Sequence, residues 1–211
     1  MNELPFSPAC ERNKGPIADV LKQLLPARAR VLEVGAGTGQ HAVHFTECMP
    51  GLNWLATDVP ANLAGLAARF AREAAGRLAE PQPLDVAHGP WPAGPFEAVY
   101  TANTLHIMPF SLAPALFAGA GEVLVDDGCL VCYGPFMDDG VHSAASNRQF
   151  DLSLRDRDPT MGIRDTRDLE RLAEAAGLRL DADIELPANN RILVFRRTEP
   201  TTSDRVSSQA S

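Results

Sequence analysis

Apolar residues are distributed along the chain in two ways, as short continuous runs and as stripes at helical spacing. Continuous runs predict buried strands, because a strand that is covered on both faces has no polar alternation. These runs lie at residues 30–34, 53–58, 96–102 and 129–133. Stripes at helical spacing predict helices at residues 11–25, 41–49, 61–78, 114–125, 143–156 and 165–176.

Three weaker segments complete the pattern. Residues 82–86 predict a short third strand, and 178–186 and 191–196 predict a terminal pair of strands joined by Pro187–Asn190. Strands that alternate with helices predict an α/β fold with a mostly parallel sheet.

The length of 211 residues fits one domain, which we place at residues 1–197. Residues 137–164 interrupt the alternation just after a strand end, where a substrate lid would lie. From Thr198 the chain becomes polar, so residues 198–211 are expected to be a disordered tail.

A glycine-rich turn follows the first predicted strand. Gly35, Gly37 and Gly39 stand at alternate positions between that strand and a helix. This arrangement presents a helix N-terminus to a ligand, although a tight turn without a ligand would have the same pattern. Glu33 precedes the turn, and its carboxylate suits an ammonium group better than a pyrophosphate.

Acidic residues also close the next two predicted strands. Asp58 is placed to accept hydrogen bonds from ribose hydroxyls, with the N-cap of the following helix as the alternative. Asp85 follows the short third strand, and the residues alone do not separate a ligand contact from an ordinary loop aspartate.

Polar residues after the fourth and fifth strands face the crevice in which α/β folds bind ligands. Asn103 and His106 follow the fourth strand, and Tyr133 ends the fifth. His106 is our first candidate for a general base and Tyr133 the second. A hydrogen-bonded structural histidine is the alternative for His106.

The acidic composition narrows the classes of partner. The formal net charge is −8 and the pI is about 5.1, which disfavours nucleic acids and anionic membranes as partners. No apolar run has the length of a membrane span, and the N-terminus lacks the features of a secretory signal. A cytoplasmic location is therefore expected.

Cysteines and histidines give little support to a metal or redox site. Cys129 and Cys132 lie on one predicted strand, where residues three apart point to opposite faces. His41, His44 and Cys48 share roughly one face of a helix, but no fourth ligand is evident. We predict no metal.

Several phrases of the sequence are similar to a family of methyltransferase-like proteins that is labelled a domain of unknown function. Its animal member is methyltransferase-like protein 26. The resemblance covers about residues 5 to 197. It rests on Ser7–Lys14, Gly37–His41, Tyr133–Phe136, Ser146–Asn147 with Phe150–Asp151, Gly162–Asp165 and Pro187–Asn190.

The resemblance implies a Rossmann-like class I methyltransferase fold, with a seven-stranded, mostly parallel sheet, an antiparallel last strand and helices on both faces. It also implies S-adenosyl-L-methionine (AdoMet) as cofactor. The implied cofactor contacts are Asn13, Glu33, Gly35, Ala36, Gly37, Asp58, Val59, Asp85, Val86 and Asn103.

The function expected from this resemblance is AdoMet-dependent methyl transfer. The chain has Asn103–His106 in place of the N/D-P-P-Y/F motif typical of many nucleic-acid and protein amine methyltransferases. Together with the acidic pI, this favours a small-molecule acceptor. One alternative is a non-catalytic AdoMet-binding or interaction module. The other is a nicotinamide-dependent oxidoreductase, against which the glycine spacing and Glu33 argue. No pattern in the sequence identifies the acceptor atom or the oligomeric state.

Overall fold

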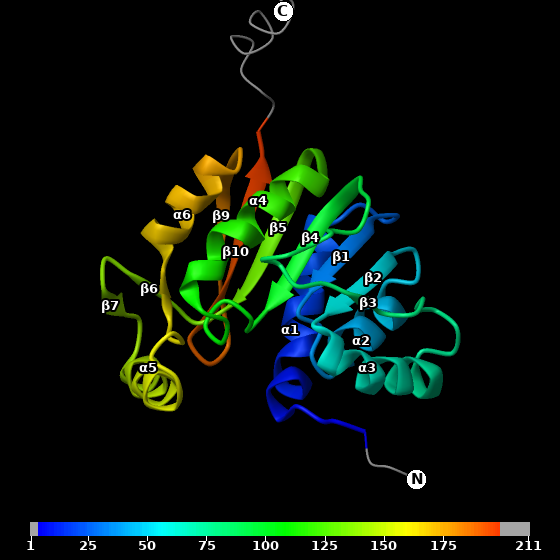
Figure 1. The fold of residues 1–211 in the computed structure, drawn as a ribbon, viewed down its shortest axis with the longest axis horizontal. Helices are drawn as coiled ribbons and strands as arrows, with labels where there is room; N and C mark the ends of the chain where they lie inside the picture. Colours follow the sequence, from blue (N-terminus) through cyan, green and yellow to red (C-terminus); the bar gives the residue numbers. More distant parts are fainter. Residues whose placement is uncertain (1–3, 199–211) are drawn as a thin grey trace, which may run out of the picture.

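The computed structural model describes residues 4–198, which form one seven-stranded sheet with helices on both faces (Figure 1). The strand order is β3-β2-β1-β4-β5-β10-β9. The strands are β1 (Arg30–Val34), β2 (Asn53–Asp58), β3 (Gln82–Pro83), β4 (Phe96–Ala102), β5 (Leu124–Gly134), β9 (Leu178–Leu186) and β10 (Asn190–Arg197).

Pairing in the sheet is parallel except at β10. β1 pairs in parallel with both β2 and β4, and β4 pairs in parallel with β5. β10, the last strand of the chain, is antiparallel to both of its neighbours, β5 and β9. This arrangement confirms the expected fold, including the antiparallel last strand and the terminal strand pair.

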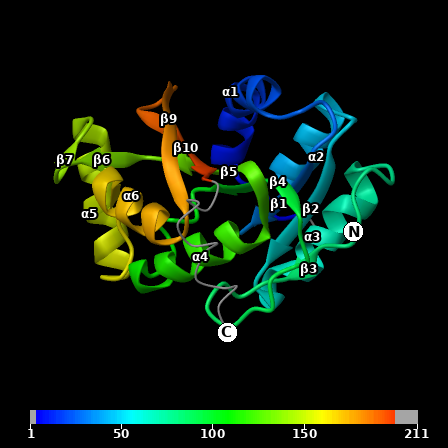
Figure 2. The ribbon, with the colours of Figure 1, turned by 90° about the horizontal axis from the view of Figure 1, so that it is seen from above.

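The helices divide between the two faces of the sheet, and Figure 2 shows α1 and α4 on opposite sides. They are α1 (Pro8–Leu24), α2 (Gln40–Cys48), α3 (Pro60–Glu73), the short 3-10 helix η1 (Phe110–Leu112), α4 (Ala113–Val123), α5 (Ala145–Arg157) and α6 (Thr166–Ala175). Neighbouring residues of β1 point to opposite faces. Val31 packs in a core with α1, α2 and α3, and Leu32 packs in a second core with α4 and α6.

Several element boundaries differ from the prediction for local reasons. α1 starts at Pro8, ahead of the predicted residue 11, because the Ser7 hydroxyl accepts the N–H of Cys10 and caps the helix. α3 ends at Glu73 and not at 78, since Ala75 and Gly76 have positive φ angles. β3 is shorter than the predicted 82–86, and β5 begins at Leu124, before the predicted residue 129.

Residues 137–164 form a small layer of their own beside α6 (Figures 1 and 2). The expected loop at 137–142 is a strand pair, β6 (Phe136–Asp138) with β7 (Val141–His142). β6 also pairs with β8 (Arg164–Asp165), and α5 lies between β7 and β8 in the chain. The segment therefore has its own three-stranded sheet, β7-β6-β8, which follows β5 in the chain after Pro135.

Two further expectations concern the predicted C-terminal tail and membrane-spanning segments. The predicted tail at 198–211 lies outside the described residues apart from Thr198, whose N–H donates to the carbonyl of Gly177 at 3.0 Å. Within residues 4–198 no helix combines the length and apolar character needed to cross a membrane.

Candidate cofactor and acceptor site

The glycine turn is bound to the end of β2. The N–H groups of Gly35 and Ala36 both donate to the carbonyl of Thr57 at 3.0 Å. Gly35, Gly37 and Gly39 have φ angles of 75°, 58° and 76°, a region that suits glycine. The turn therefore lies at the carboxyl ends of β1 and β2, where open α/β sheets bind ligands.

Asp58 faces this turn from the end of β2. Its Oδ2 accepts the N–H of Gly37 at 2.6 Å, and its Oδ1 accepts the N–H of Val59 at 2.7 Å and the side-chain amide of Asn62 at 2.8 Å. The N-cap of α3 is Val59, so Asp58 is not the capping residue considered above. Since Oδ2 accepts one bond and a carboxylate oxygen can accept two, Oδ2 retains capacity for a hydroxyl donor.

Glu33 lies under the turn with its side chain in the core, 2% exposed. Its Oε2 accepts the indole N–H of Trp54 at 2.8 Å. Burial raises the pKa of Glu33 to about 7, with the nearby charge of Asp58 adding to the rise and the Trp54 hydrogen bond opposing it. Near neutral pH the group therefore exchanges between a neutral acid and a carboxylate that could hold an ammonium group.

We expect Glu33→Gln to become more stable than the wild type as pH rises. The raised pKa means that the folded state keeps a proton between about pH 4.5 and pH 7 that the unfolded state loses. The wild type therefore loses stability across this window, on the order of 2–3 kcal/mol, whereas glutamine stays neutral and can still accept the Trp54 bond. Urea unfolding at pH 5, 6, 7 and 8 measures the difference, and parallel pH profiles for the two proteins would contradict the assignment.

Asn13 on α1 belongs to a buried chain of polar groups. Burial lowers the pKa of His41 to about 4, so its ring is neutral. The His41 Nε2–H donates to Asn13 Oδ1 at 2.7 Å, and the Tyr100 hydroxyl donates to His41 Nδ1 at 3.3 Å. This chain holds the Asn13 side chain in a fixed orientation beside Tyr133, at the ends of the strands.

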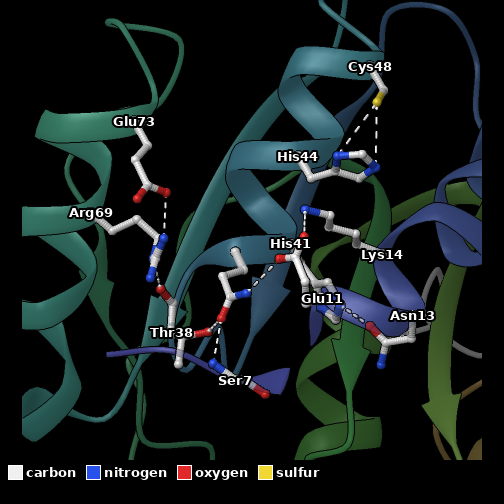
Figure 3. Close-up of polar contacts among 11 residues, drawn as sticks. Ser7, Glu11, Asn13, Lys14, Thr38, His41, His44, Cys48, Arg69 and Glu73 are labelled. Carbon is white, nitrogen blue, oxygen red and sulfur yellow. Dashed lines mark hydrogen bonds and ion pairs between the residues drawn. The ribbon is translucent and has the colours of Figure 1, made fainter. Parts of the chain in front are cut away.

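A second network joins the N-terminal segment to the glycine turn (Figure 3). The Arg69 guanidinium donates to the carbonyl of Thr38 and to the carbonyl of Pro5, both at 2.6 Å. The N–H of Ser7 donates to the side-chain oxygen of Gln40 at 2.6 Å. Arg69 is not among the predicted site residues, and its only signal in the sequence is a charge on the apolar face of α3.

Figure 3 also shows that the two histidines of α2 have different neighbours. His44 lies against Cys48, with 3.6 Å between Nε2 and Sγ, whereas His41 points toward Asn13 (Figure 3). Within residues 4–198 no group of three or more His, Cys, Asp or Glu side chains is arranged to hold a metal ion.

Asp85 lies on the surface beyond β3. Its carboxylate accepts from His88 Nδ1 and from the N–H of Ala87, both at 2.9 Å, and these bonds lower its pKa. It borders a cavity of about 410 Å³ together with Trp91, while Val86 is half-buried against the core. Their contact with adenine stays a prediction.

The two candidate bases occupy different environments. His106 is 5% exposed, with its ring edge-on to Phe150 at 5.3 Å between centroids. Burial lowers the pKa of His106 to about 4, and the charges of Arg164 and Arg157 add to this effect. Tyr133 borders the cavity described next, and burial raises its pKa although the Asn13 side chain opposes the rise.

A cavity of about 540 Å³ lies at the carboxyl ends of β4 and β5. Four separate parts of the chain enclose it: α1, the strand ends, α5 and the turn between β9 and β10. The lining residues are Ala9, Arg12, Asn13, Pro16, Asn103, Tyr133, Pro135, Ser146, Asn147, Phe150 and Leu186–Asn190. The cavity thus brings together three predicted site residues, Asn13, Asn103 and Tyr133, and His106 is not among its lining.

Segment 137–164 forms one wall of the cavity and is firmly attached. The N–H of Gly162 donates to the carbonyl of His106 at 3.0 Å. The buried Arg164 guanidinium donates to the carbonyls of Leu105, Met108 and Thr160 at 2.7–2.9 Å. These bonds fix the segment to the loop after β4.

Comparison with solved structures places the sheet among methyltransferases. Human N-acetylserotonin methyltransferase in complex with SAM is 16% identical with a TM-score of 0.76, and the match covers 90% of this chain and 53% of that chain. The mitomycin 7-O-methyltransferase MmcR is 20% identical with a TM-score of 0.76, over 90% and 54%. CalO1, a methyltransferase in calicheamicin biosynthesis in its SAH-bound form, is 22% identical with a TM-score of 0.72, over 89% and 55%.

These likenesses show the Rossmann-like class I methyltransferase fold, and the chain spans about half the length of the proteins it matches. A family model described as "Protein of unknown function (DUF938)" matches residues 4–197. The chain therefore belongs to the DUF938 family of proteins of unknown function.

Proposed function

We propose that this protein transfers a methyl group from AdoMet to a small-molecule acceptor. The observation that carries the proposal is the position of the 540 Å³ cavity at the ends of β4 and β5, since β4 pairs with β1, the strand that leads into the glycine turn faced by Asp58. The similar structures bound to SAM and SAH support the choice of cofactor. A relation to methyltransferase-like protein 26 and a cytoplasmic location are further parts of the proposal that rest on the sequence.

The glycine turn, Glu33 and Asp58 would hold the methionine and ribose parts of AdoMet, and Asn103 and Asn13 would face the reacting end. Bound AdoMet supplies a methyl group on a sulfonium leaving group. The chain's own contribution would be to align the acceptor and exclude water, with α1 and α5 as the walls and segment 137–164 as a fixed lid.

Neither candidate base is suited to proton removal from an acceptor. With a pKa of about 4 His106 is a weak base, and it does not line the cavity. Tyr133 does line the cavity, but its raised pKa makes it a hydrogen-bond donor near neutral pH. We therefore propose that alignment dominates, with an acceptor that needs little help to lose a proton.

The lack of a general base in the cavity favours a second candidate function for this protein, a non-catalytic AdoMet-binding module. The cavity lining contains no Asp, Glu, His, Cys or Lys side chain that could act as a general base, and the raised pKa of Tyr133 keeps its hydroxyl protonated near neutral pH. An acceptor screen with radiolabelled AdoMet separates the two functions, because a binding module would bind the cofactor without transferring the methyl group.

Calorimetric titration with AdoMet and with S-adenosylhomocysteine tests the cofactor site. We expect one-to-one binding and a loss of about 100-fold in affinity in Asp58→Ala, because a ribose hydroxyl would lose its charged acceptor. Asp181→Ala is the matched control, since this carboxylate binds Arg196 on β10, away from the strand ends at the turn. Absence of binding by the wild type, or equal affinity in Asp58→Ala, would refute the site.

A further inference from the structure

We propose that the 540 Å³ cavity selects an acceptor that carries a carboxylate on a flat apolar body, and that the guanidinium of Arg12 binds this carboxylate. The inference rests on the proposed function, whose acceptor it narrows to one chemical class. Its basis is the side-chain chemistry of the cavity, which differs sharply from that of the whole chain.

The cavity has no acidic residue in a strongly acidic protein. The chain carries 27 Asp and Glu residues and a formal net charge of −8, yet none of the lining residues is acidic. Arg12 is the one charged residue in the lining. A site without carboxylates and with one cation repels other cations and favours a monoanion.

Arg12 is available to a ligand. None of the ion pairs found within residues 4–198 includes it. Its charge nevertheless acts at the cavity, since it is one of the influences that oppose the burial-driven rise in the pKa of Tyr133. A free guanidinium at a cavity wall matches the planar, bidentate geometry of a carboxylate.

The wall that α5 contributes to the cavity also favours an anion, through its backbone. Ser146 and Asn147 line the cavity from the first turn of α5. That turn contains no acidic residue, and its N-cap Ala144 supplies no capping side chain. The first N–H groups of a helix and its dipole favour negative charge, so this wall adds to the attraction of Arg12.

The remaining lining residues indicate the shape and polarity of the part of the acceptor that carries the carboxylate. Phe150 is 40% exposed, and it stands with Pro16, Pro135 and Leu186 as an apolar surface for a flat group. Asn103 also lines the cavity, and its backbone is fixed by a hydrogen bond from its N–H to the carbonyl of Tyr133 at 2.8 Å, so its side-chain amide is the group that would bind a polar substituent. A single cation suits a carboxylate better than a phosphate dianion, which commonly takes several cationic donors.

Matched acids and amides test the proposal. The probes are 4-hydroxybenzoate with 4-hydroxybenzamide, and cinnamate with cinnamide, titrated into the full chain with and without saturating S-adenosylhomocysteine. We expect each acid to bind about tenfold more tightly than its amide, because the guanidinium contact is charge-assisted. In Arg12→Gln the preference should fall to about onefold while the affinity of the amides stays unchanged.

Arg148→Gln is the matched control. Arg148 is an exposed arginine of α5, next to Asn147, and it does not line the cavity. Arg148→Gln should keep the preference for the acid over the amide. An effect of net charge alone would instead lower this preference equally in Arg148→Gln and Arg12→Gln. Equal affinities for acid and amide in the wild type, a preference that survives Arg12→Gln, or no binding of any probe at 5 mM would each overturn the proposal. Failure of S-adenosylhomocysteine to bind would refute the cofactor, and the titrations without it would still decide the acid preference.

Discussion

Gly39→Ala is expected to lower the free energy of unfolding by about 2–4 kcal/mol. The φ angle of Gly39 is 76°, which costs an alanine about 1–2 kcal/mol. A Cβ at this position would also lie 2.9 Å from Leu66 Cδ2 and 3.0 Å from Phe70 Cε1. Both side chains are buried in the core under α3, so they cannot move aside freely, and overpacking costs about 1–3 kcal/mol.

Gly37→Ala is the matched variant on the same turn. Its φ is 58°, but nothing lies within 4 Å of an added Cβ. It should therefore lose only about 1 kcal/mol of stability. The added methyl group would enter the space beside Asp58 that we assign to AdoMet, so cofactor affinity should fall at least about tenfold.

Urea unfolding and calorimetric titration of the two variants separate folding from binding. The expected result is a large loss of stability in Gly39→Ala and a loss mainly of cofactor affinity in Gly37→Ala. Equal losses of stability in both would show that strain alone accounts for the glycines, and unchanged affinity in Gly37→Ala would place the cofactor elsewhere.

Arg164→Met is expected to lower the free energy of unfolding by about 3 kcal/mol or more. The buried guanidinium supplies donors to the carbonyls of Leu105, Met108 and Thr160, and methionine supplies none. A buried acceptor that loses its partner costs about 1–3 kcal/mol. The guanidinium also stacks over the Phe110 ring at 5.1 Å, a contact that methionine replaces only in part.

Two companion variants show whether the effect belongs to these bonds. Arg157→Met removes an exposed arginine at the end of α5 and should change stability by less than about 0.5 kcal/mol. Arg164→Lys should recover part of the loss, because lysine keeps the charge but not the planar fork. Equal unfolding curves for Arg164→Met and Arg157→Met would show that the carbonyls find other donors, and hydrogen exchange at Gly162 would then identify the rearranged segment.

Much of the fold could be predicted because it depends on local patterns. Continuous apolar runs and helical stripes located the main strands and helices, and Asp58 lies at a strand end as predicted, facing the glycine turn. The errors arose where local chemistry decided the boundary. Ser7 caps α1 earlier than its apolar stripe begins, and Ala75 with Gly76 ends α3 before its stripe does.

The cavity could not be predicted, because four distant parts of the chain form it. The burial of individual polar side chains could not be predicted from the sequence either. His106 lies at the predicted strand end, but its buried ring has a lowered pKa and faces Phe150. Arg164 lies in the short stretch between the predicted helices 143–156 and 165–176, which has no apolar periodicity, so nothing in its neighbourhood indicated a buried cation. Both outcomes depend on how segment 137–164 docks, which is a property of the tertiary structure.

The hydrogen bonds of Arg69 couple two parts of the molecule. They run from the carbonyl of Pro5 through one guanidinium to the carbonyl of Thr38 in the glycine turn. A ligand that stabilises the turn is therefore expected to stabilise the N-terminal segment as well, and an ordered N-terminal segment would favour ligand binding by the same coupling free energy, since thermodynamic coupling is reciprocal. Ligand binding at the turn should therefore slow proteolysis at residues 5–7, so the rate of cleavage in the N-terminal segment would report whether the turn is occupied.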